Sequence, residues 1–274
     1  MVLEIGRYSY HQMYKKITKS LSRDAQLIRL LVTRELTVRY KRSVIGIGWT
    51  LLNPMITSFV LWIVFANNFG QKLDSGQQYA PYLMAGTLLN TFFSQGIMSS
   101  ATSIGKNASI LTKIYVKPQV FTLSAAISGL VNFSIGLLPL SLVCLVSGQT
   151  ISPTFPLVIL VAISLVSTVA GLGLVLSVIF IRFSDTANVT AVLLTMLSYL
   201  TPLFYPISSL SPKMQKIVSL NPITSYLDCF RWAFSNNASA TMGDWIYIVL
   251  TGILSLILGI SFFKRYWPRV VAML

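Results

Sequence analysis

The sequence predicts an all-α integral membrane protein with six membrane-spanning helices, and three observations lead to this fold class. Of the 274 residues, 54% are hydrophobic and only 10% are charged, whereas about 25% of the residues in a soluble domain carry charge. Six uncharged stretches are each long enough to cross about 30 Å of hydrocarbon as a helix. Most of the 21 Lys and Arg residues fall on one side of these stretches, as in multi-pass membrane proteins.

Residues 1–48 are predicted to form a cytoplasmic arm and an interfacial helix. The first 21 residues are polar and contain no apolar run of signal-peptide length. From Ser22, which can cap a helix, leucine and valine side chains recur at helical spacing against basic residues. This pattern predicts an amphipathic helix that lies along the inner surface of the membrane.

The segment Val38–Pro54 marks the change from a surface helix to a membrane span. Its basic side chains can reach lipid headgroups, Gly46 and Gly48 allow a turn, and Trp49 suits the membrane interface. An uncharged run then continues to Phe69. The first crossing is therefore predicted to begin here.

Residues 49–274 are predicted to form one transmembrane domain. Its spans lie at about residues 50–68, 81–104, 120–146, 154–181, 188–205 and 245–263. By the positive-inside rule, the distribution of Lys and Arg places both termini in the cytoplasm. The net charge of +14 then reflects topology and anionic lipid, and no nucleic-acid partner is expected.

The fifth connection, residues 206–244, is predicted to be a re-entrant helical hairpin on the outer face. It is too long for a simple turn and too rich in aromatic and aliphatic residues for a solvated loop. One short helix begins at Pro212, Asn221-Pro222 interrupts it, and a second helix follows. At about 1.5 Å per residue, each piece reaches only halfway through a bilayer. The alternative is an interfacial cap that packs on the other helices.

The acidic residues and the cysteines exclude several classes of function. None of the seven Asp and Glu residues lies in the middle of a predicted span, so the buried carboxylate of a proton-coupled carrier is absent from the sequence. The sequence has no Gly-x-x-x-x-Gly-Lys-Ser/Thr loop, so any ATP and Mg must bind a separate subunit. Cys144 and Cys229 match no metal-ligand spacing. We expect neither a cofactor, nor a metal site, nor enzyme activity in this chain.

Several spaced motifs resemble the membrane subunit of ABC-2-type exporters of cell-surface polysaccharides, the family of O-antigen, capsule and teichoic acid permeases. The motifs are Arg39–Pro54, Tyr82–Gly86, Phe92–Gln95, Thr201–Pro206 and Leu220–Pro222, and the resemblance extends from Arg29 to Arg269. It implies a homodimer in the bacterial inner membrane that works with two copies of a cytoplasmic ABC ATPase subunit. It also implies a glycan of O-antigen, galactan or teichoic acid type on a polyprenyl pyrophosphate carrier. A drug or lipid exporter and an ATP-independent channel or scaffold are the alternative functions.

Within this framework, aromatic and hydroxyl side chains on the first and fifth spans are candidates for a glycan channel, because sugars present both apolar faces and hydroxyl groups. These residues are Met55, Phe59, Trp62, Thr195, Tyr199 and Tyr205. The alternative is that the aromatic residues face lipid or form an interfacial belt. The second span carries a mildly polar stripe, for which simple helix packing is the competing interpretation; it comprises Thr87, Thr91, Ser94, Met98 and Thr102.

Three further groups of residues are predicted around this channel. A basic belt for the pyrophosphate of the carrier comprises Arg34, Arg39, Lys41 and Arg42, because arginine binds phosphate oxygens bidentately; general attraction to anionic lipid is the alternative. A loop with a capping Asn and exposed apolar residues is expected to dock on the ATPase subunit, and it comprises Asn107, Ile110, Leu111, Lys113 and Ile114; a plain surface helix is the alternative. An outer gate is assigned to Pro206, Met214, Ile217, Tyr226 and Phe230.

Overall fold

The computed structural model describes residues 23–38, 41, 45–46, 48–69, 73, 78–113, 116–183, 185–235 and 240–271, and these residues contain helices and no strand. After a helix at residues 23–38, the helices are α2 (Gly48–Phe69), α3 (Tyr79–Lys106), α4 (Ala108–Leu111), α5 (Gln119–Val146), η2 (Phe155–Leu157), α6 (Val158–Arg182), α7 (Thr186–Leu200), η3 (Ile207–Ser209), α8 (Pro212–Ser219), α9 (Pro222–Ser235) and α10 (Met242–Val270). The all-helical fold class is thereby confirmed.

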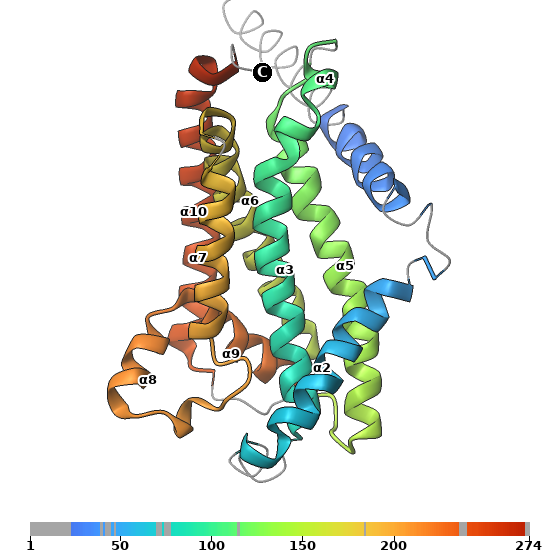
Figure 1. The fold of residues 1–274 in the computed structure, drawn as a ribbon, viewed down its shortest axis with the longest axis vertical. Coiled ribbons are helices and arrows are strands. Elements are labelled where there is room, and N and C mark those ends of the chain that lie inside the picture. Colours follow the sequence, from blue (N-terminus) through green and yellow to red (C-terminus); the bar gives the residue numbers. More distant parts are fainter. Residues whose placement is uncertain are drawn as a thin grey trace, which may run out of the picture.

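The long helices form an elongated bundle with α3 at its centre (Figure 1). Helix α3 packs against α2, α5, α6, α7 and α9, while α6 packs along α10. The helix at residues 23–38, α4 and the C-terminal part of α10 lie toward one end of the bundle, and α8 and α9 lie at the opposite end (Figure 1). These two ends frame the site described below.

Four of the described helices are long and apolar enough to cross a membrane. They are the segments Gly48–Ala66, Gln119–Val146, Phe155–Arg182 and Met242–Val270. Helix α3 is long enough but more polar, and α7 has only 15 residues. Both helices occur where spans are predicted, so the structure supports a membrane protein with several spans.

Helix α7 ends earlier than predicted, because prolines follow it closely. The fifth span was expected to reach residue 205, but α7 stops at Leu200. Pro202 and Pro206 lack the backbone N–H that would continue the helix, and each disfavours a helical conformation in the residue before it. Residues 201–206 therefore form an irregular connection. In contrast, α10 extends beyond the prediction at both ends and begins with a capping box between Thr241 and Asp244.

Glycine allows α6 and α10 to cross at backbone contact. A Cβ atom added to Gly171 would lie 2.2 Å from the carbonyl oxygen of Ser255, and one added to Gly259 would lie 2.4 Å from that of Gly171. Small residues at helix crossings in membranes permit this close approach. The structure thus gives Gly171 a packing role at the crossing of α6 and α10.

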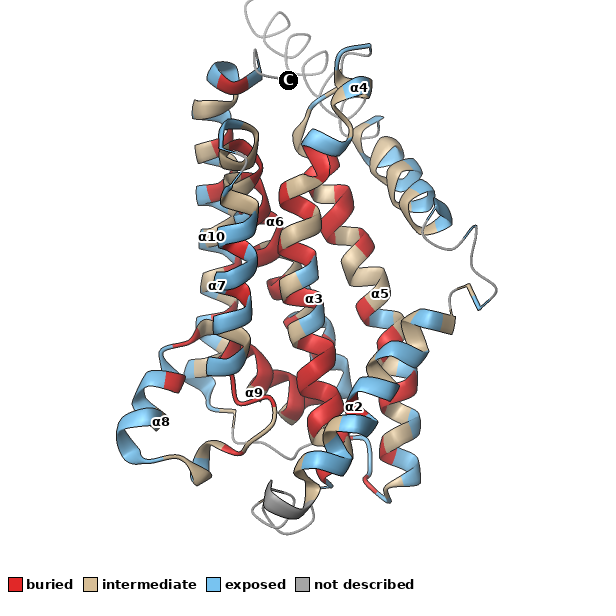
Figure 2. Cartoon of the chain, in the orientation of Figure 1, coloured by how far each residue is buried: buried red, intermediate tan, exposed pale blue. Residues whose placement is uncertain are grey.

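The buried side chains form two apolar clusters (Figure 2). The larger one joins α3, α5, α6, α9 and α10 through residues such as Phe92, Phe133, Leu165, Tyr226 and Phe230. The smaller one lies near Phe121, Phe263 and Val270, where α3, α5, α6 and α10 approach the end that carries α4. Beside the first part of α2, a groove separates this helix from α3 and α5.

Candidate functional site

A polar groove of about 630 Å³ runs between α2, α3 and α5. Along α3 its lining extends from Thr87 to Lys106, which at 1.5 Å per residue is about 28 Å. That length is close to the thickness of the hydrocarbon core of a bilayer, about 30 Å. The groove is therefore long enough to serve as a path through much of the membrane.

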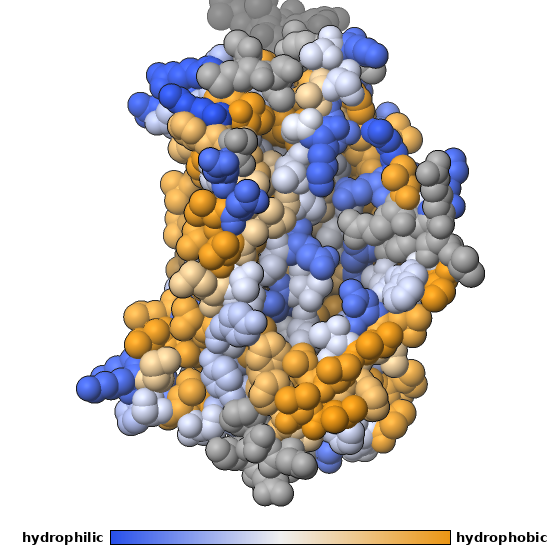
Figure 3. All heavy atoms as spheres, viewed as in Figure 1, coloured by the Kyte–Doolittle hydropathy of each residue, from blue (hydrophilic) through white to orange (hydrophobic). Residues whose placement is uncertain are grey.

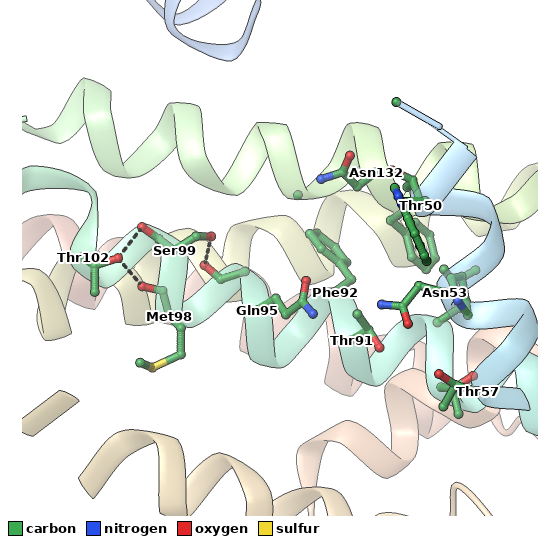
Figure 4. A pocket seen from close by; sticks show the side chains of 18 of the residues that line it. Thr50, Asn53, Thr57, Thr91, Phe92, Gln95, Met98, Ser99, Thr102 and Asn132 are labelled. Atoms are coloured by element: carbon green, nitrogen blue, oxygen red, sulfur yellow. Dashed lines mark hydrogen bonds between the residues drawn. The ribbon is translucent and has the colours of Figure 1, made fainter. Parts of the chain in front are cut away.

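Helical periodicity places the polar side chains of two helices on the groove. Thr50, Asn53 and Thr57 recur every three or four residues along α2, and Thr91 and Gln95 do so on α3. Such residues share one helix face. Figure 4 shows Asn53 and Gln95 turned toward the space between the two helices.

The amides of Asn53 and Gln95 form no hydrogen bond within the part of the chain that the structure describes, and both side chains are exposed. An amide without a hydrogen-bond partner costs several kcal/mol, in the range of about 2–7, on transfer into an apolar medium. Lipid tails cannot supply such a partner. The groove must therefore face water, a polar ligand or polar groups outside the described residues.

The hydropathy of the surface agrees with this conclusion. Figure 3 shows a hydrophilic strip along the middle of the bundle, with hydrophobic surface on both sides of it. The apolar surface of α2 includes Ile56, Val60, Ile63 and Val64, which are all exposed. The polar face of α2 thus points into the groove while its apolar face points away from it.

A positively charged end of the groove lies near α4. Lys106 is exposed at the last residue of α3, and Arg34 of the helix at residues 23–38 donates a hydrogen bond of 3.5 Å to the neighbouring Asn107. The Asn107 side chain donates to the carbonyl of Ser103 at 2.8 Å. The sequence predicted that the Asn107 side chain would cap α4, but it does not. That side chain is instead held by α3 and Arg34.

The predicted channel residues of α2 lie on a face away from the polar groove. Phe59 and Trp62 are 60% and 42% exposed and stack on each other, with 6.2 Å between ring centroids. Met55 is half-buried and packs against the larger core. None of these three residues lines the groove.

The predicted channel residues of the fifth span lie on and just after α7. Thr195 and Tyr199 are exposed, and Tyr199 is 71% exposed. The half-buried Tyr205 donates a hydrogen bond to the carbonyl of Tyr199 at 3.1 Å. Only Thr190 and Leu194 of α7 are buried. Within one chain, the structure does not gather the predicted channel residues into one site.

The basic belt is only partly described. Arg34 and Lys41 are exposed, whereas Arg39 and Arg42 lie outside the described residues. Gly46, in the turn that follows, has a φ of +57°, as expected for a glycine needed at the start of α2.

The predicted docking loop is less exposed than expected. Ile110 and Leu111 are half-buried because they pack against the smaller apolar cluster. Lys113 is exposed, and Ile114 lies outside the described residues. The loop is therefore anchored to the bundle, and its exposed surface is polar.

The predicted outer gate divides into a core part and a surface part. Tyr226 and Phe230 are 1% and 0% exposed, and the Tyr226 hydroxyl donates a hydrogen bond of 2.9 Å to the carbonyl of Ile248. Pro206 is buried, whereas Met214 and Ile217 are exposed on α8. Helix α9 is thus anchored in the bundle while α8 projects from it (Figure 1).

Sequence reasoning missed the contribution of α2 and α5 to the groove. The stripe on the second span was recognised, and Thr87, Thr91, Met98 and Thr102 indeed line the groove. Asn53 and Asn132 were not singled out. The available signal was the three- and four-residue spacing of polar residues in the otherwise apolar α2. No cluster of three or more His, Cys, Asp or Glu residues that could hold a metal occurs among the described residues.

Comparisons with known proteins identify the class of this helical membrane protein. Residues 26–235 match the family model described as "ABC-2 type transporter". The chain is 29% identical over 224 residues to the O-antigen export system permease protein RfbA of Myxococcus xanthus, with 80% of this chain and 84% of that protein covered. It is 24% identical over 252 residues to RfbA of Klebsiella pneumoniae, covering 90% of this chain and 95% of that protein.

A third relative is the capsule polysaccharide export inner-membrane protein CtrC of Neisseria meningitidis. It is 23% identical over 249 residues, which cover 90% of this chain and 94% of CtrC. The chain therefore belongs to the ABC-2 transporter family.

Proposed function

We propose that this chain is the membrane subunit of an ATP-driven exporter that moves lipid-linked cell-surface polysaccharide, of O-antigen, galactan or teichoic acid type, across the bacterial inner membrane. The observation that carries the proposal is the polar groove, in which the amides of Asn53 and Gln95 have no hydrogen-bond partner among the described residues and need a polar one. Two relatives are named as proteins of O-antigen export and capsule polysaccharide export, which supports this class of substrate.

The groove suits an uncharged glycan. Threonine hydroxyls and Asn and Gln amides both donate and accept hydrogen bonds, as sugar hydroxyls do. The exposed Trp49 adds aromatic surface to the lining, on which the apolar faces of sugar rings can pack. Lys106 is the basic residue among the lining side chains, so most of the path carries no charge that would hold a neutral polymer.

The proposed topology has six spans with both termini in the cytoplasm. Helices α3 and α7 are the two spans in addition to the four apolar ones, since α3 owes its polarity to the groove. In this orientation α4 faces the cytoplasm, and α8 and α9 form a re-entrant hairpin on the outer face. The positive-inside distribution of Lys and Arg supports this orientation.

The proposed assembly is a homodimer with two ATPase subunits, which bind ATP and Mg. Helix α7 leaves all but two of its residues unburied in the single chain, and α2 exposes Phe59 and Trp62. A two-fold assembly would bring these faces of two copies around one path. The exposed surface around Lys113 is the proposed contact with the ATPase subunit.

The carrier pyrophosphate is proposed to bind the basic belt, to which Lys106 adds a further cation at the end of the groove. Arginine and lysine provide the donors and the charge that a diphosphate requires. Arg34 lies beside Asn107, which follows Lys106 directly. The polymer would then extend from this charged end into the uncharged groove.

Two measurements test the proposed function. Cells depleted of this chain should accumulate lipid-linked glycan, and ATP turnover by the purified complex should be stimulated by that glycan. Stimulation by hydrophobic compounds instead would indicate a drug or lipid exporter. Failure to co-purify with any ATPase subunit would indicate a channel or scaffold.

A further inference from the structure

The irregular connection after α7 is held by an unusual set of contacts. Residues 201–206 lie outside regular helix, so their backbone carbonyls need other hydrogen-bond partners when they are buried. Pro202 and Leu203 are buried. The partners come from α3 and α9, which are remote in sequence.

Arg231 of α9 binds this connection with its guanidinium group. It is 4% exposed. Nη1 donates to the carbonyl of Pro202 at 3.1 Å, and Nη2 donates to the carbonyls of Leu203 at 3.3 Å and Tyr82 at 3.0 Å. One side chain of α9 therefore joins the 201–206 segment to the beginning of α3.

Two tyrosines of α3 complete the arrangement. The guanidinium carbon of Arg231 lies 3.5 Å from the ring centroid of Tyr82, a cation–π contact. The Tyr82 hydroxyl donates to the carbonyls of Pro202 at 3.2 Å and Tyr205 at 2.9 Å, and the Tyr79 hydroxyl donates to that of Phe204. Four consecutive carbonyls, those of residues 202–205, are thus bound by three side chains.

The motifs recognised in the sequence meet at this point. Gly86 ends the Tyr82–Gly86 motif, and a Cβ atom there would lie 2.9 Å from Nη2 of Arg231 and 3.2 Å from the Leu203 carbonyl oxygen. A larger residue at this position would crowd both groups. The Asn221 side chain donates to Oγ1 of Thr201 at 2.8 Å, which adds the Leu220–Pro222 motif.

The positive charge of Arg231 makes these contacts mutually dependent. No carboxylate forms an ion pair with Arg231 among the described residues, although Asp228 lies one helical turn away. A buried charge without polar partners is strongly unfavourable. Here the backbone carbonyls and the Tyr82 ring are the partners that stabilise the charge of Arg231. Release of the 201–206 segment therefore requires the whole set of contacts to separate together.

The 201–206 segment lies beside the end of the groove that begins at Thr87. Gly86 touches Leu203 and is followed by Thr87, where the groove lining of α3 begins. Phe204 stacks on Phe65 of α2, with 6.0 Å between centroids. The segment thus connects the end of α7 to α2 across the beginning of α3, at the end of the groove opposite Lys106.

We propose that Arg231 is a positioning residue for transport, which holds the 201–206 segment across this end of the groove until ATP turnover releases it. The inference rests on the proposed transport function. A polymer that passes along the groove toward α8 and α9 must displace this segment. Arg231 and Tyr82 set the free energy required to do so.

The test uses the full-length permease with its ATPase subunit in lipid nanodiscs, where a water-soluble maleimide reaches both ends of the bundle. Leu203→Cys is the reporter, because Leu203 is 1% exposed. The same complex without the reporter measures the background from Cys144 and Cys229, which are both buried.

Arg231→Met should raise the labelling rate of the reporter at least tenfold, because it removes the donors and the charge. Arg231→Lys should give a smaller increase, and Tyr82→Phe should raise the rate severalfold, because it removes a hydroxyl that binds two carbonyls but keeps the ring. Lys216→Met, on the exposed face of α8, is the matched control and should leave the rate unchanged. Without these substitutions, ATP turnover should accelerate labelling.

Two results would overturn the proposal: equal labelling in Arg231→Met and its parent, or labelling of the parent that ATP turnover leaves unchanged. If Arg231→Met does not accumulate in membranes, the comparison of Tyr82→Phe with its parent decides in the same way. Labelling requires no glycan, so a failure of the proposed substrate class would appear in the accumulation and stimulation assays and not here.

Discussion

Lys117 forms an ion pair with Asp24 at 2.6 Å, and this contact ties the helix at residues 23–38 to the connection between α4 and α5. The same helix contacts Asn107 through Arg34, and its Leu31 packs against the smaller apolar cluster. The helix at residues 23–38 is therefore attached to residues on both sides of α4, where the ATPase contact is proposed. We expect motion of that contact to be passed to the beginning of α2.

Reversal of the Asp24–Lys117 pair tests this attachment. Lys117→Glu places two carboxylates together and should lower glycan-stimulated ATP turnover severalfold, while Asp24→Lys with Lys117→Glu should restore it. The pair is partly exposed, with side-chain exposures of 55% for Lys117 and 29% for Asp24, so the free energy of unfolding should change by less than about 1 kcal/mol. A double variant as impaired as the single one would show that the pair does not transmit the motion.

The exposed surface of the docking loop gives a second prediction. Substitution of Ile110 and Leu111 by Asp would disrupt the smaller apolar cluster as well as the surface of the loop. Ser109→Glu with Lys113→Glu changes the surface alone, because both residues are exposed. Co-purification of the ATPase subunit should be lost while thermal unfolding of the permease stays the same. Lys264→Glu, exposed on α10, serves as the control, and unchanged co-purification in the double variant would place the ATPase contact elsewhere.

The amides of the groove give a third prediction. Asn53→Leu and Gln95→Leu should each lower glycan-stimulated ATP turnover by roughly 2–12-fold, the equivalent of one lost hydrogen bond of about 0.5–1.5 kcal/mol. Neither change should destabilise the protein, because neither amide has a partner among the described residues. Ser134→Leu, on an exposed position of α5, is the control. Full stimulation in both variants would mean that substrate does not enter the groove.

The predicted channel faces give a fourth prediction. Cysteines placed at Phe59, Trp62, Thr195 and Tyr199 should react with a water-soluble thiol reagent during ATP turnover, and Phe59→Ala and Tyr199→Ala should impair export at normal protein levels. If these faces of two copies line one glycan path, both the thiol labelling and the loss of export should be observed. Labelling of all four positions by lipid-soluble probes alone would place these faces in the bilayer.

Asp228 gives a fifth prediction, on pH. Burial raises the pKa of Asp228 to about 6, the nearby Asp244 also raises it, and Arg231 lowers it. Because the folded protein binds this proton more tightly than the unfolded chain, the carboxyl favours folding at low pH, and this stabilisation is lost as the pH rises through about 6. The thermal midpoint of Asp228→Asn should therefore exceed that of the parent at pH 7.5 and approach it at pH 4.5. Asp185→Asn, exposed before α7, should show no such pattern.

Helix positions were largely predictable, because their signals are local. The start of α8 at Pro212, the interruption at Pro222 and the turn at Gly46 each follow from the chemistry of one or two residues. The end of α7 was placed too late, since the uncharged run continues past Leu200 although prolines prevent the helix from doing so.

The face that each helix presents was harder to predict. In a membrane, lipid and protein interiors are similarly apolar, so the hydrophobicity of Phe59 on α2 does not reveal whether its side chain meets lipid or the core. The contacts of Arg231 were also missed, because a Lys or Arg in a connection between spans was used only to assign that connection to one side of the membrane. Its contact with Tyr82 joins residues 149 positions apart, and no local pattern encodes that distance.

The close crossing of α6 and α10 has a mechanical consequence. Where the carbonyl of Gly171 meets Gly259, neither helix can slide or rotate without a collision between backbones, so the two helices must move as a single rigid strut. Motion is left to α2, which lines the groove, and to α7, which buries only two of its residues. ATP turnover should therefore produce a hinge motion of α2 and α7 relative to the α6–α10 pair. Distances measured between labels on α6 and α10 should stay constant during turnover.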